Sequence, residues 1–208
     1  MNLLQFVLEN GLGLDVGAEM KKRVFDRFGM THTSMTWQPQ YADNVTTGYD
    51  ADGKANPHDQ RSHVRAAGSM DTTITDYARF LAAVTRGAGL KTGTYADMLR
   101  PQIMITSAHQ FPTLDFSHMP DDPHWALAAG LGWVVYKGRY GPSFYKGGHD
   151  DFTDNHAVCV EAQKRCLLMM TNSGVGARLF PALTAAVMGD PGTPWSWEYN
   201  PILPLAPA

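Results

Sequence analysis

Residues 143–171 read SFYKGGHDDFTDNHAVCVEAQKRCLLMMT, and this stretch decides the fold. It holds three apolar runs, 143–146, 155–160 and 166–171, which are separated by polar and glycine-containing turns. Short apolar runs bounded by turn residues are typical of strands. Because the connections are too short for a crossover helix, neighbouring strands must be antiparallel. A further run at 127–136 predicts another strand of the same sheet.

Helical periodicity precedes this sheet. Apolar residues at helical spacing predict two helices within residues 2–27, with a glycine-containing break between them. A longer helix is expected over 68–84, because its apolar side chains form one stripe. Thr73 or Asp71 would cap the start of this helix, and Gly87 would end it. The sequence therefore places helices early and strands late.

Composition along the chain divides it into three parts. Residues 1–125 are a mostly helical region with a long polar loop at 37–66. Residues 126–190 hold the antiparallel strands and a terminal helix, and residues 191–208 form a proline-rich tail. A loop as long as 37–66 in a compact domain usually shapes a binding site. Little periodicity survives over 103–124, which we expect to be a connector.

Overall composition argues against several classes of protein. The 208 residues are 44% hydrophobic and 18% charged, as in ordinary globular proteins. A net charge of −3 gives no positive stripe to neutralise phosphates, so no nucleic-acid partner is expected. No apolar run approaches the roughly 18 residues of a membrane-spanning helix. We therefore expect a soluble protein with no membrane span.

The amino-terminal stretch Met1–Leu8 lacks the basic region of a signal peptide, and polar residues follow it directly. It predicts a helix, and a cytoplasmic protein if the chain truly begins at Met1. If the true amino end lies upstream, the localisation is undetermined.

The two cysteines, Cys159 and Cys166, flank a predicted hairpin turn. They would be directly opposed if a two-residue turn is centred on Ala162–Gln163, whereas a longer loop or a one-residue change of register would separate them. Whether they are bonded is left open by the sequence, but the frequency of cysteine in protein cores favours two buried free thiols. Neither cysteine has the spacing of a zinc site or of a redox pair.

Histidine and carboxylate side chains cluster at His149–Asp151 and Asn155–His156. Their spacing matches no known zinc pattern, and turns between strands commonly carry such residues. We therefore expect no metal site and no cofactor.

Five strings now agree in order with one protein family. They are VFDRFGMTHTSM at 24–35, AGSMDTT with DYARF at 67–80, LGW at 131–133, KGGH at 146–149 and LMMTNS at 168–173. This set resembles motifs of the β-lactamase-related serine hydrolases, which include class C β-lactamases, D-alanyl-D-alanine carboxypeptidases and family VIII carboxylesterases. The resemblance covers about residues 15–190. It implies an α+β, partial β-lactamase/transpeptidase-like fold: an antiparallel sheet, a terminal helix across it, and a preceding helical region.

The resemblance also shows what this sequence lacks. Family members use a serine and a lysine in an S-x-x-K motif, with a tyrosine from Y-x-N, and both motifs precede the segment where this chain begins. Such a lysine takes the serine proton so that an acyl-enzyme forms. We therefore expect a carboxy-terminal portion of a serine hydrolase, inactive alone. The alternative is a non-catalytic binding or interaction module that kept the pocket wall.

The resemblance places the candidate site at Lys146-Gly147-Gly148-His149. Lys146 would attract a substrate carboxylate, the glycines would let a substrate approach the backbone, and the backbone N–H of His149 would form one arm of an oxyanion hole. The family usually has threonine or serine at the position of Gly147. Glycine removes that hydrogen-bond donor, which favours ester or peptide substrates over β-lactams. The alternative is that Lys146 is only a charge at a strand end.

Two other strings match family motifs by letter alone. Ser143-Phe-Tyr-Lys146 spells S-x-x-K, but on a strand these two side chains point to opposite faces. Lys91-Thr92-Gly93 spells the family's K-T-G, but it falls in a predicted surface loop before a short helix at 95–99. Neither is expected to be functional.

The expected partners follow from the same reasoning. A complete enzyme would take a small-molecule ester, amide or peptide, although the sequence does not specify which one. The missing amino-terminal strands would leave an exposed sheet edge, so a homo-oligomer or a partner segment is expected.

Overall fold

The computed structural model describes residues 1–111 and 126–199. The chain forms two compact units, one of Met1–Thr47 with Pro57–Val84, the other of Gly48–Asn56 with the chain from Thr85 onward. The division by composition at residues 125 and 190 stays a prediction. Within the described residues, no helix is long and apolar enough to cross a bilayer.

The first unit begins with the two predicted helical segments. They comprise α1 (Asn2–Phe6) continued by the π-helical η1 (Val7–Gly11), then α2 (Val16–Met20), the π-helical η2 (Lys21–Phe25) and α3 (Asp26–Phe28). The Asp15 carboxylate caps the second segment by accepting the Ala18 N–H at 2.9 Å. Gly29 ends it in the left-handed conformation, with φ of 67°, as the sequence predicts.

The third helix of this unit, α4 (Ile74–Thr85), begins at the cap that the sequence suggests. The Thr73 hydroxyl accepts the Asp76 N–H at 3.2 Å, so Thr73 rather than Asp71 is the cap. Asp71 instead pairs through its backbone with Ser34. The buried core of the unit contains Phe25, Met30 and Met35, and Phe80 of α4 packs against these residues.

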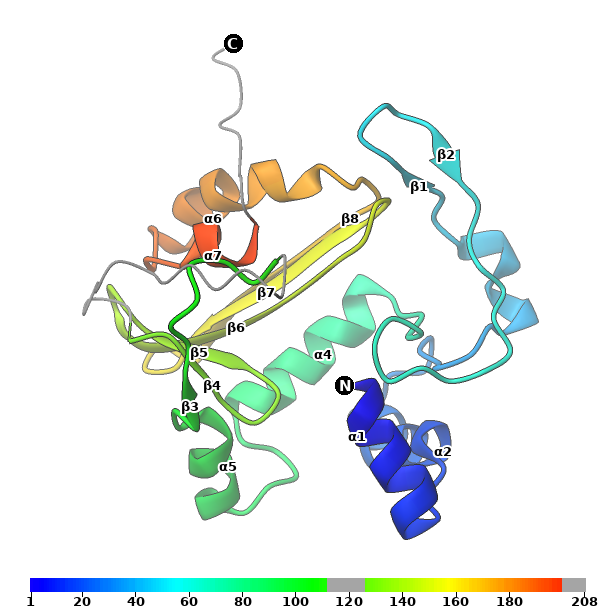
Figure 1. Ribbon diagram of the computed structural model, residues 1–208, viewed down its shortest axis with the longest axis horizontal. Coiled ribbons are helices and arrows are strands. Elements are labelled where there is room, and N and C mark those ends of the chain that lie inside the picture. Colours follow the sequence, from blue (N-terminus) through cyan, green and yellow to red (C-terminus); the bar gives the residue numbers. More distant parts are fainter. Residues whose placement is uncertain (112–125, 200–208) are drawn as a thin grey trace. The chain divides into compact units, whose positions relative to one another are not determined.

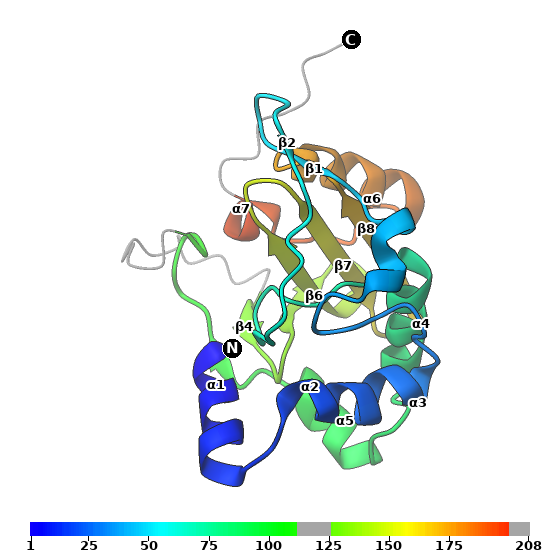
Figure 2. The same cartoon turned by 90° about the vertical axis from the view of Figure 1, so that its right-hand side faces the viewer.

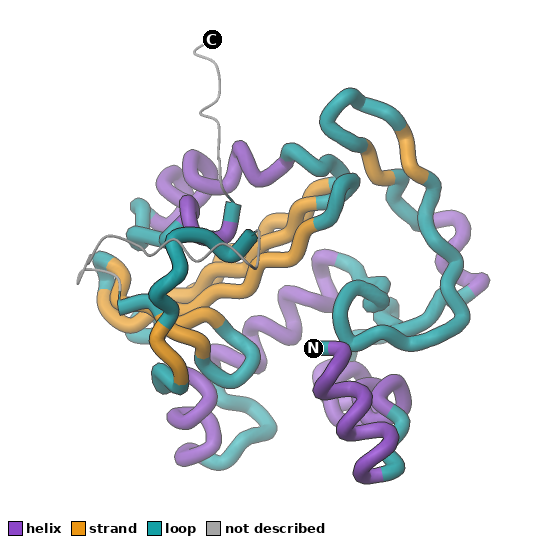
Figure 3. Tube along the Cα trace, in the orientation of Figure 1, coloured by secondary structure: helices purple, strands orange, loops and turns teal. Residues whose placement is uncertain are grey.

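The predicted loop at 37–66 is mostly turn and loop, with a short 3-10 helix, η3 (Pro39–Asn44) (Figure 3). It also contains a small hairpin of β1 (Gly48–Tyr49) and β2 (Ala55–Asn56). Asp50 closes the hairpin turn, because its carboxylate accepts the backbone N–H groups of Asp52 and Lys54.

The second unit is built on a six-stranded antiparallel sheet (Figures 1 and 2). Its strands, in spatial as well as chain order, are β3 (Ile103–Met104), β4 (Ala128–Ala129), β5 (Val134–Gly138), β6 (Gly141–His149), β7 (Asp154–Val160) and β8 (Arg165–Thr171). The α+β class and the late antiparallel strands are therefore confirmed.

Two details of the predicted strands are wrong. The run at 127–136 is two strands rather than one, because Gly130 and Trp133 close a tight turn between β4 and β5. The connector at 103–124 begins with strand β3, which pairs with β4. Short strands like β3 carry too few residues to show a period of two. Residues 112–124 of this connector lie outside the described residues.

Helices cover one face of this sheet (Figure 1). They are α6 (Phe180–Met188), preceded by the 3-10 helix η4 (Gly176–Leu179), and the short α7 (Trp195–Glu198). Phe180 of α6 packs against Met169 of β8, so the terminal helix lies across the sheet as predicted. Trp197 of α7 is buried in the sheet's main apolar cluster with Tyr145 and Val158. The beginning of the proline-rich tail therefore belongs to the core.

The expectation of free thiols is wrong, because Cys159 and Cys166 form a disulfide. The register of the β7–β8 hairpin is the one centred on Ala162–Gln163, and it places the two cysteines directly opposite each other. Their Cα atoms lie 4.1 Å apart, close to the separation of a non-hydrogen-bonded antiparallel pair. Pairing geometry, rather than the frequency of buried thiols, decides their state.

Candidate active-site strand

Strand β6 extends beyond its neighbour β5, and the candidate residues lie on the extension. The pairing with β5 ends where Tyr145 meets Val134, the first residue of β5. Of the described strands, only β7 pairs with Lys146–His149. A strand edge of this kind can pair with a bound ligand in an extended conformation.

The residues of this extension alternate between the two faces of the sheet. Tyr145 and Gly147 are buried, whereas Lys146 and Gly148 are exposed. The Lys146 ammonium donates a hydrogen bond to the carbonyl of Gly147, so the cation lies against the backbone of its own strand. His149 is exposed at the strand end, with its ring near those of Phe111 and Tyr199.

The two misleading motifs lie apart from this arrangement. Ser143 is buried in β6 with its hydroxyl bonded to the Gly141 carbonyl at 3.1 Å, while Lys146 is exposed. Lys91-Thr92-Gly93 is exposed as predicted, but it is not a loop. It forms the start of α5 (Thr92–Leu99), and the Lys91 carbonyl accepts the N–H of Tyr95. A glycine in a first turn hides this helix start from sequence reasoning.

Gly147 and Gly148 differ in the space around them. A Cβ atom at Gly148 would meet nothing within 4 Å. A Cβ atom at Gly147 would collide with the carboxylate of Glu198, approaching its Cδ to 2.7 Å, and would lie 2.9 Å from the hydroxyl of Tyr199. Glycine is thus required at 147 by packing on the buried face, whereas Gly148 leaves the exposed face open.

A buried polar cluster lies beneath the candidate strand. His156 of β7 pairs directly with Gly147, and its ring stacks on Tyr145 with centroids 5.1 Å apart. The Tyr199 hydroxyl lies 3.2 Å from His156 Nδ1 and 3.1 Å from the Asn155 carbonyl. When the hydroxyl donates its hydrogen to the Asn155 carbonyl, Nδ1 of His156 carries the hydrogen that joins it to Tyr199. Nε2 of the same ring is buried and has no hydrogen-bond partner among the described residues.

Burial changes the titration of this cluster. It lowers the pKa of His156 to about 3, with a smaller contribution from the positive charge of Lys146. Burial raises the pKa of Glu198 to about 6, although Lys146 acts in the opposite direction. Once its amide nitrogen is turned toward Glu198, Gln110 donates to both carboxylate oxygens, at 2.7 and 3.1 Å. Glu198 is thus a buried carboxyl group that accepts hydrogen bonds from the neutral Gln110 amide and interacts electrostatically with the Lys146 ammonium.

Sequence reasoning missed Glu198, Tyr199 and the role of His156. The only signal was the aromatic string Trp195-Ser-Trp-Glu-Tyr199, which predicts packing onto the body of the protein without saying where. For the metal question, the described residues contain no group of three or more histidine, cysteine, aspartate or glutamate side chains placed to hold an ion.

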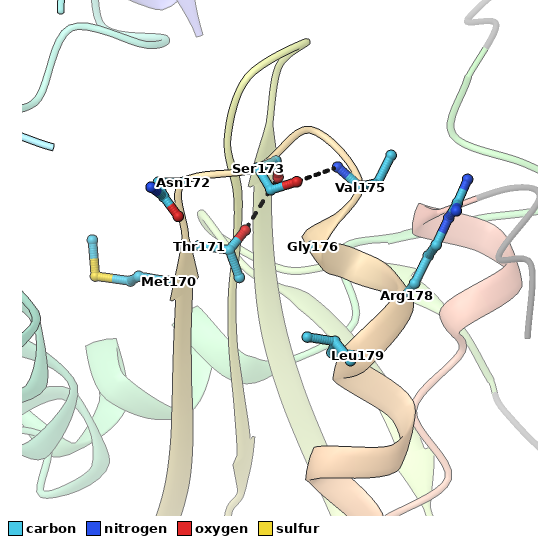
Figure 4. A pocket seen from close by; sticks show the side chains of 8 residues that line it. All are labelled: Met170, Thr171, Asn172, Ser173, Val175, Gly176, Arg178 and Leu179. Atoms are coloured by element: carbon cyan, nitrogen blue, oxygen red, sulfur yellow. Dashed lines mark hydrogen bonds between the residues drawn. The ribbon is translucent and has the colours of Figure 1, made fainter. Parts of the chain in front are cut away.

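An open pocket of about 550 Å³ lies at the same end of the sheet (Figure 4). The end of β8 and the start of η4 form its wall, with Thr171, Asn172, Ser173 and Arg178 as its polar residues. The register aligns His149 with Asp154, and Asp154 with Thr171. Thr171 therefore lies two strands, or about 10 Å, from His149. The Asp154 carboxylate accepts the Ala177 N–H at 2.8 Å and fixes η4 beside the pocket.

Solved structures share this arrangement of sheet and helices. A class C β-lactamase superposes with a TM-score of 0.63 at 14% identity, over 83% of this chain and 50% of the other. An octameric penicillin-binding protein homologue from Pyrococcus abyssi superposes with a TM-score of 0.66 at 18% identity, over 90% of this chain and 41% of the other. A D-alanine carboxypeptidase from Burkholderia cenocepacia superposes with a TM-score of 0.63 at 16% identity, over 83% of this chain and 54% of the other. The chain thus spans about half the length of these structures.

The antiparallel sheet with a helix across one face is therefore the part of the fold that this chain shares with a class C β-lactamase. The sequence model of the Beta-lactamase family matches residues 1–188, so the chain belongs to the β-lactamase family. Comparison with curated proteins gives no significant match. The α+β, β-lactamase-like fold expected from the sequence is confirmed.

The low pKa of His156 predicts a loss of stability in acid. The unfolded chain binds a proton at this histidine below about pH 6.5, whereas the folded protein does so only near pH 3. The stabilisation is therefore complete above pH 6.5 and disappears as the pH falls toward 3. In urea unfolding, the advantage of wild type over His156→Asn should shrink by about 2 to 3 kcal/mol between pH 7.5 and pH 4.5.

Glu198→Gln is the control, because the contribution of Glu198 to folding stability changes with pH in the opposite direction. Its pKa is raised from 4.5 to about 6, so its stabilisation is present below 4.5 and is lost as the pH rises through 6. A constant difference between wild type and His156→Asn across the pH range would contradict a buried neutral histidine.

Proposed function

We propose that this chain supplies the lysine-bearing wall of an acyl-transfer site of the serine hydrolase type. One observation carries the proposal: Lys146–His149 overhangs β5, with its cation and Gly148 on the exposed face. A carbonyl compound that lies along this edge can accept the His149 N–H, which would stabilise the oxyanion of a tetrahedral intermediate. Membership of the β-lactamase family supports the same general chemistry.

Lys146 is the charged group of the proposed site. Its ammonium would donate a charge-assisted hydrogen bond to a substrate carboxylate or to a developing negative charge. The open space over Gly148 allows a substrate to reach the backbone, which a side chain there would prevent. The polar pocket with Arg178 lies about two strands away and would receive the outer part of a substrate.

The substrate class proposed for this site is an ester or a peptide amide. Position 147 has no hydroxyl group, and the space where one would lie is filled by Glu198 and Tyr199. A β-lactam carboxylate would therefore find one donor fewer than at a site with serine or threonine there. The alternative, a binding module without chemistry, would use the same pocket and strand.

The 208-residue chain by itself should show no turnover. Its only S-x-x-K string is Ser143–Lys146, whose serine is buried in β6 and whose lysine is exposed. We expect no hydrolysis of nitrocefin or p-nitrophenyl esters above a heat-denatured control, and no labelling by a fluorophosphonate. Stoichiometric labelling of one serine would overturn this expectation.

Two lysine substitutions test where the motif lies. In a protein extended upstream by a segment with S-x-x-K and Y-x-N, Lys146→Ala should lower kcat/KM by roughly 10- to 100-fold, since it removes a charge-assisted hydrogen bond of about 1.5 to 3 kcal/mol. Lys91→Ala, at the exposed start of α5, should stay near wild type. Equal losses would mean that the site is elsewhere. If both variants bind a p-nitrophenyl ester without turnover, the binding-module alternative is favoured.

We also propose that the chain associates with another segment or with a second copy. Strand β8 lies at the edge of the described sheet, and its Leu168 and Met170 are only partly buried. In the other unit, Leu3 and Phe6 of α1 are 77% and 61% exposed. Unpaired edges and exposed apolar side chains of this size favour association.

Light scattering during size-exclusion chromatography tests this association. We expect dimers or larger species at micromolar concentration, together with binding of a hydrophobic dye. Leu3→Glu with Phe6→Glu should reduce dye binding, whereas Lys22→Glu on the exposed part of η2 should not. A monodisperse wild-type monomer that binds no dye would refute the proposal.

A further inference from the structure

The short helix α7 lies against the buried face of the candidate strand. Its Glu198 is 4% exposed and the following Tyr199 is 8% exposed, although both carry polar groups. Their side chains fill the volume beside Gly147 that a side chain at that position would occupy. These two residues lie beyond residues 1–188, the part matched by the family model. The contact therefore involves tail residues that the family model does not cover.

Hydrogen bonds fix α7 on both sides of this contact. The Gln110 N–H donates to the Trp197 carbonyl at 2.8 Å, and the Trp197 indole donates to the Ser107 hydroxyl at 3.2 Å. Tyr199 bonds to β7 at Asn155 and His156, the residues that pair with Gly148 and Gly147. The tail therefore holds the same two strands that position Lys146 and the His149 N–H.

Glu198 interacts electrostatically with Tyr145 and Lys146 of β6 and with Tyr199, which follows α7. The other titratable groups on the elements packed here are His149 of β6 and Asp154 and His156 of β7, which interact with Tyr199, and His109, which lies beside Ser196 of α7. Lys146 is the cation that acts on the Glu198 carboxylate. The carboxylate and the ammonium therefore attract each other.

We propose that Glu198 and Tyr199 are positioning residues for the Lys146–His149 segment, and that position 147 is glycine because the tail occupies the place of its side chain. The inference rests on the proposed function only in treating Lys146–His149 as a functional site. The contact itself does not depend on any reaction. In physical terms, a carboxylate and a phenol replace the missing side chain at 147. They support the strand from its buried face and keep a negative charge near Lys146.

A double-mutant cycle between positions 147 and 198 tests the packing. Gly147→Ala should raise the hydrogen-exchange rate of the 195–199 amides at least about tenfold, because the new methyl group expels Glu198. In the Glu198→Ala background, the same substitution should change exchange less than about threefold. Gly148→Ala is the matched control, since nothing lies within 4 Å of its Cβ position. Equal effects of Gly147→Ala in both backgrounds, or the same effect from Gly148→Ala, would overturn the proposal.

The charge of Glu198 is tested separately on Lys146. With lysine side chains isotopically labelled, wild type should show a step in the Lys146 signal near pH 6, where Glu198 titrates. Glu198→Gln keeps the shape of the side chain, so it should abolish this step while the backbone amide signals of Lys146–His149 stay in place. Glu198→Ala should shift those amide signals, and Glu161→Gln in the β7–β8 turn, where the side chain is only partly buried, should change neither.

These measurements test the positioning role of Glu198 without the need for a substrate. If Glu198→Ala fails to fold, the wild-type step near pH 6 and its loss in Glu198→Gln still decide the question. An unchanged Lys146 step in Glu198→Gln, or unshifted 146–149 amides in Glu198→Ala, would refute the positioning role. A negative activity assay in the extended protein would count against the proposed function alone, because these measurements use the 208-residue chain.

Discussion

The pairing of β6 with β7 is the constraint on which the rest of the site depends. Seven residue pairs join the two strands, from Ser143 with Val160 to His149 with Asp154. This register places Gly147 beside His156, and it fixes which residues face the helices and which face outward. A slip by one residue would bury Lys146 and expose Tyr145, so both the core and the candidate site would be lost together.

The polar groups on the buried face of this strand pair are only partly satisfied by each other, because the Tyr145 hydroxyl and His156 Nε2 are buried without a hydrogen-bond partner in the described part of the chain. Tyr199 bonds to both Asn155 and His156, and Gln110 reaches the carboxylate of Glu198. Burial keeps His156 neutral and makes Glu198 easier to protonate, so their contributions to stability have opposite dependence on pH. In the folded protein both groups are uncharged between about pH 3 and pH 6, so neither then holds an unfavourable charge in the buried cluster.

Sequence reasoning predicted those parts of the fold that depend on neighbours in the chain. Turn residues and apolar runs were sufficient for β6 to β8, and of the registers that the sequence left open for the cysteines, the structure has the one with the turn centred on Ala162–Gln163. The bond between the cysteines was missed, because the frequency of a residue type says nothing about its partner. The helix start at Lys91 was missed because Thr92 and Gly93 have weak helix propensity.

The candidate site was predictable only on its exposed face. Lys146, Gly148 and His149 belong to a short sequence motif, and the structure places all three on the exposed part of β6. The contact of Gly147 with Glu198 joins residues 51 positions apart, and no local pattern encodes it.

A strand has two faces, so adjacent glycines in one motif can be required for unrelated reasons. Gly148 borders open space on the exposed face, whereas Gly147 leaves room for the protein's own tail. Packing of the core against Glu198 and Tyr199 is therefore sufficient to explain why position 147 carries no hydroxyl group. A serine introduced there to restore the family's donor would first have to displace a buried carboxylate, and it would weaken the support of the strand it was meant to improve.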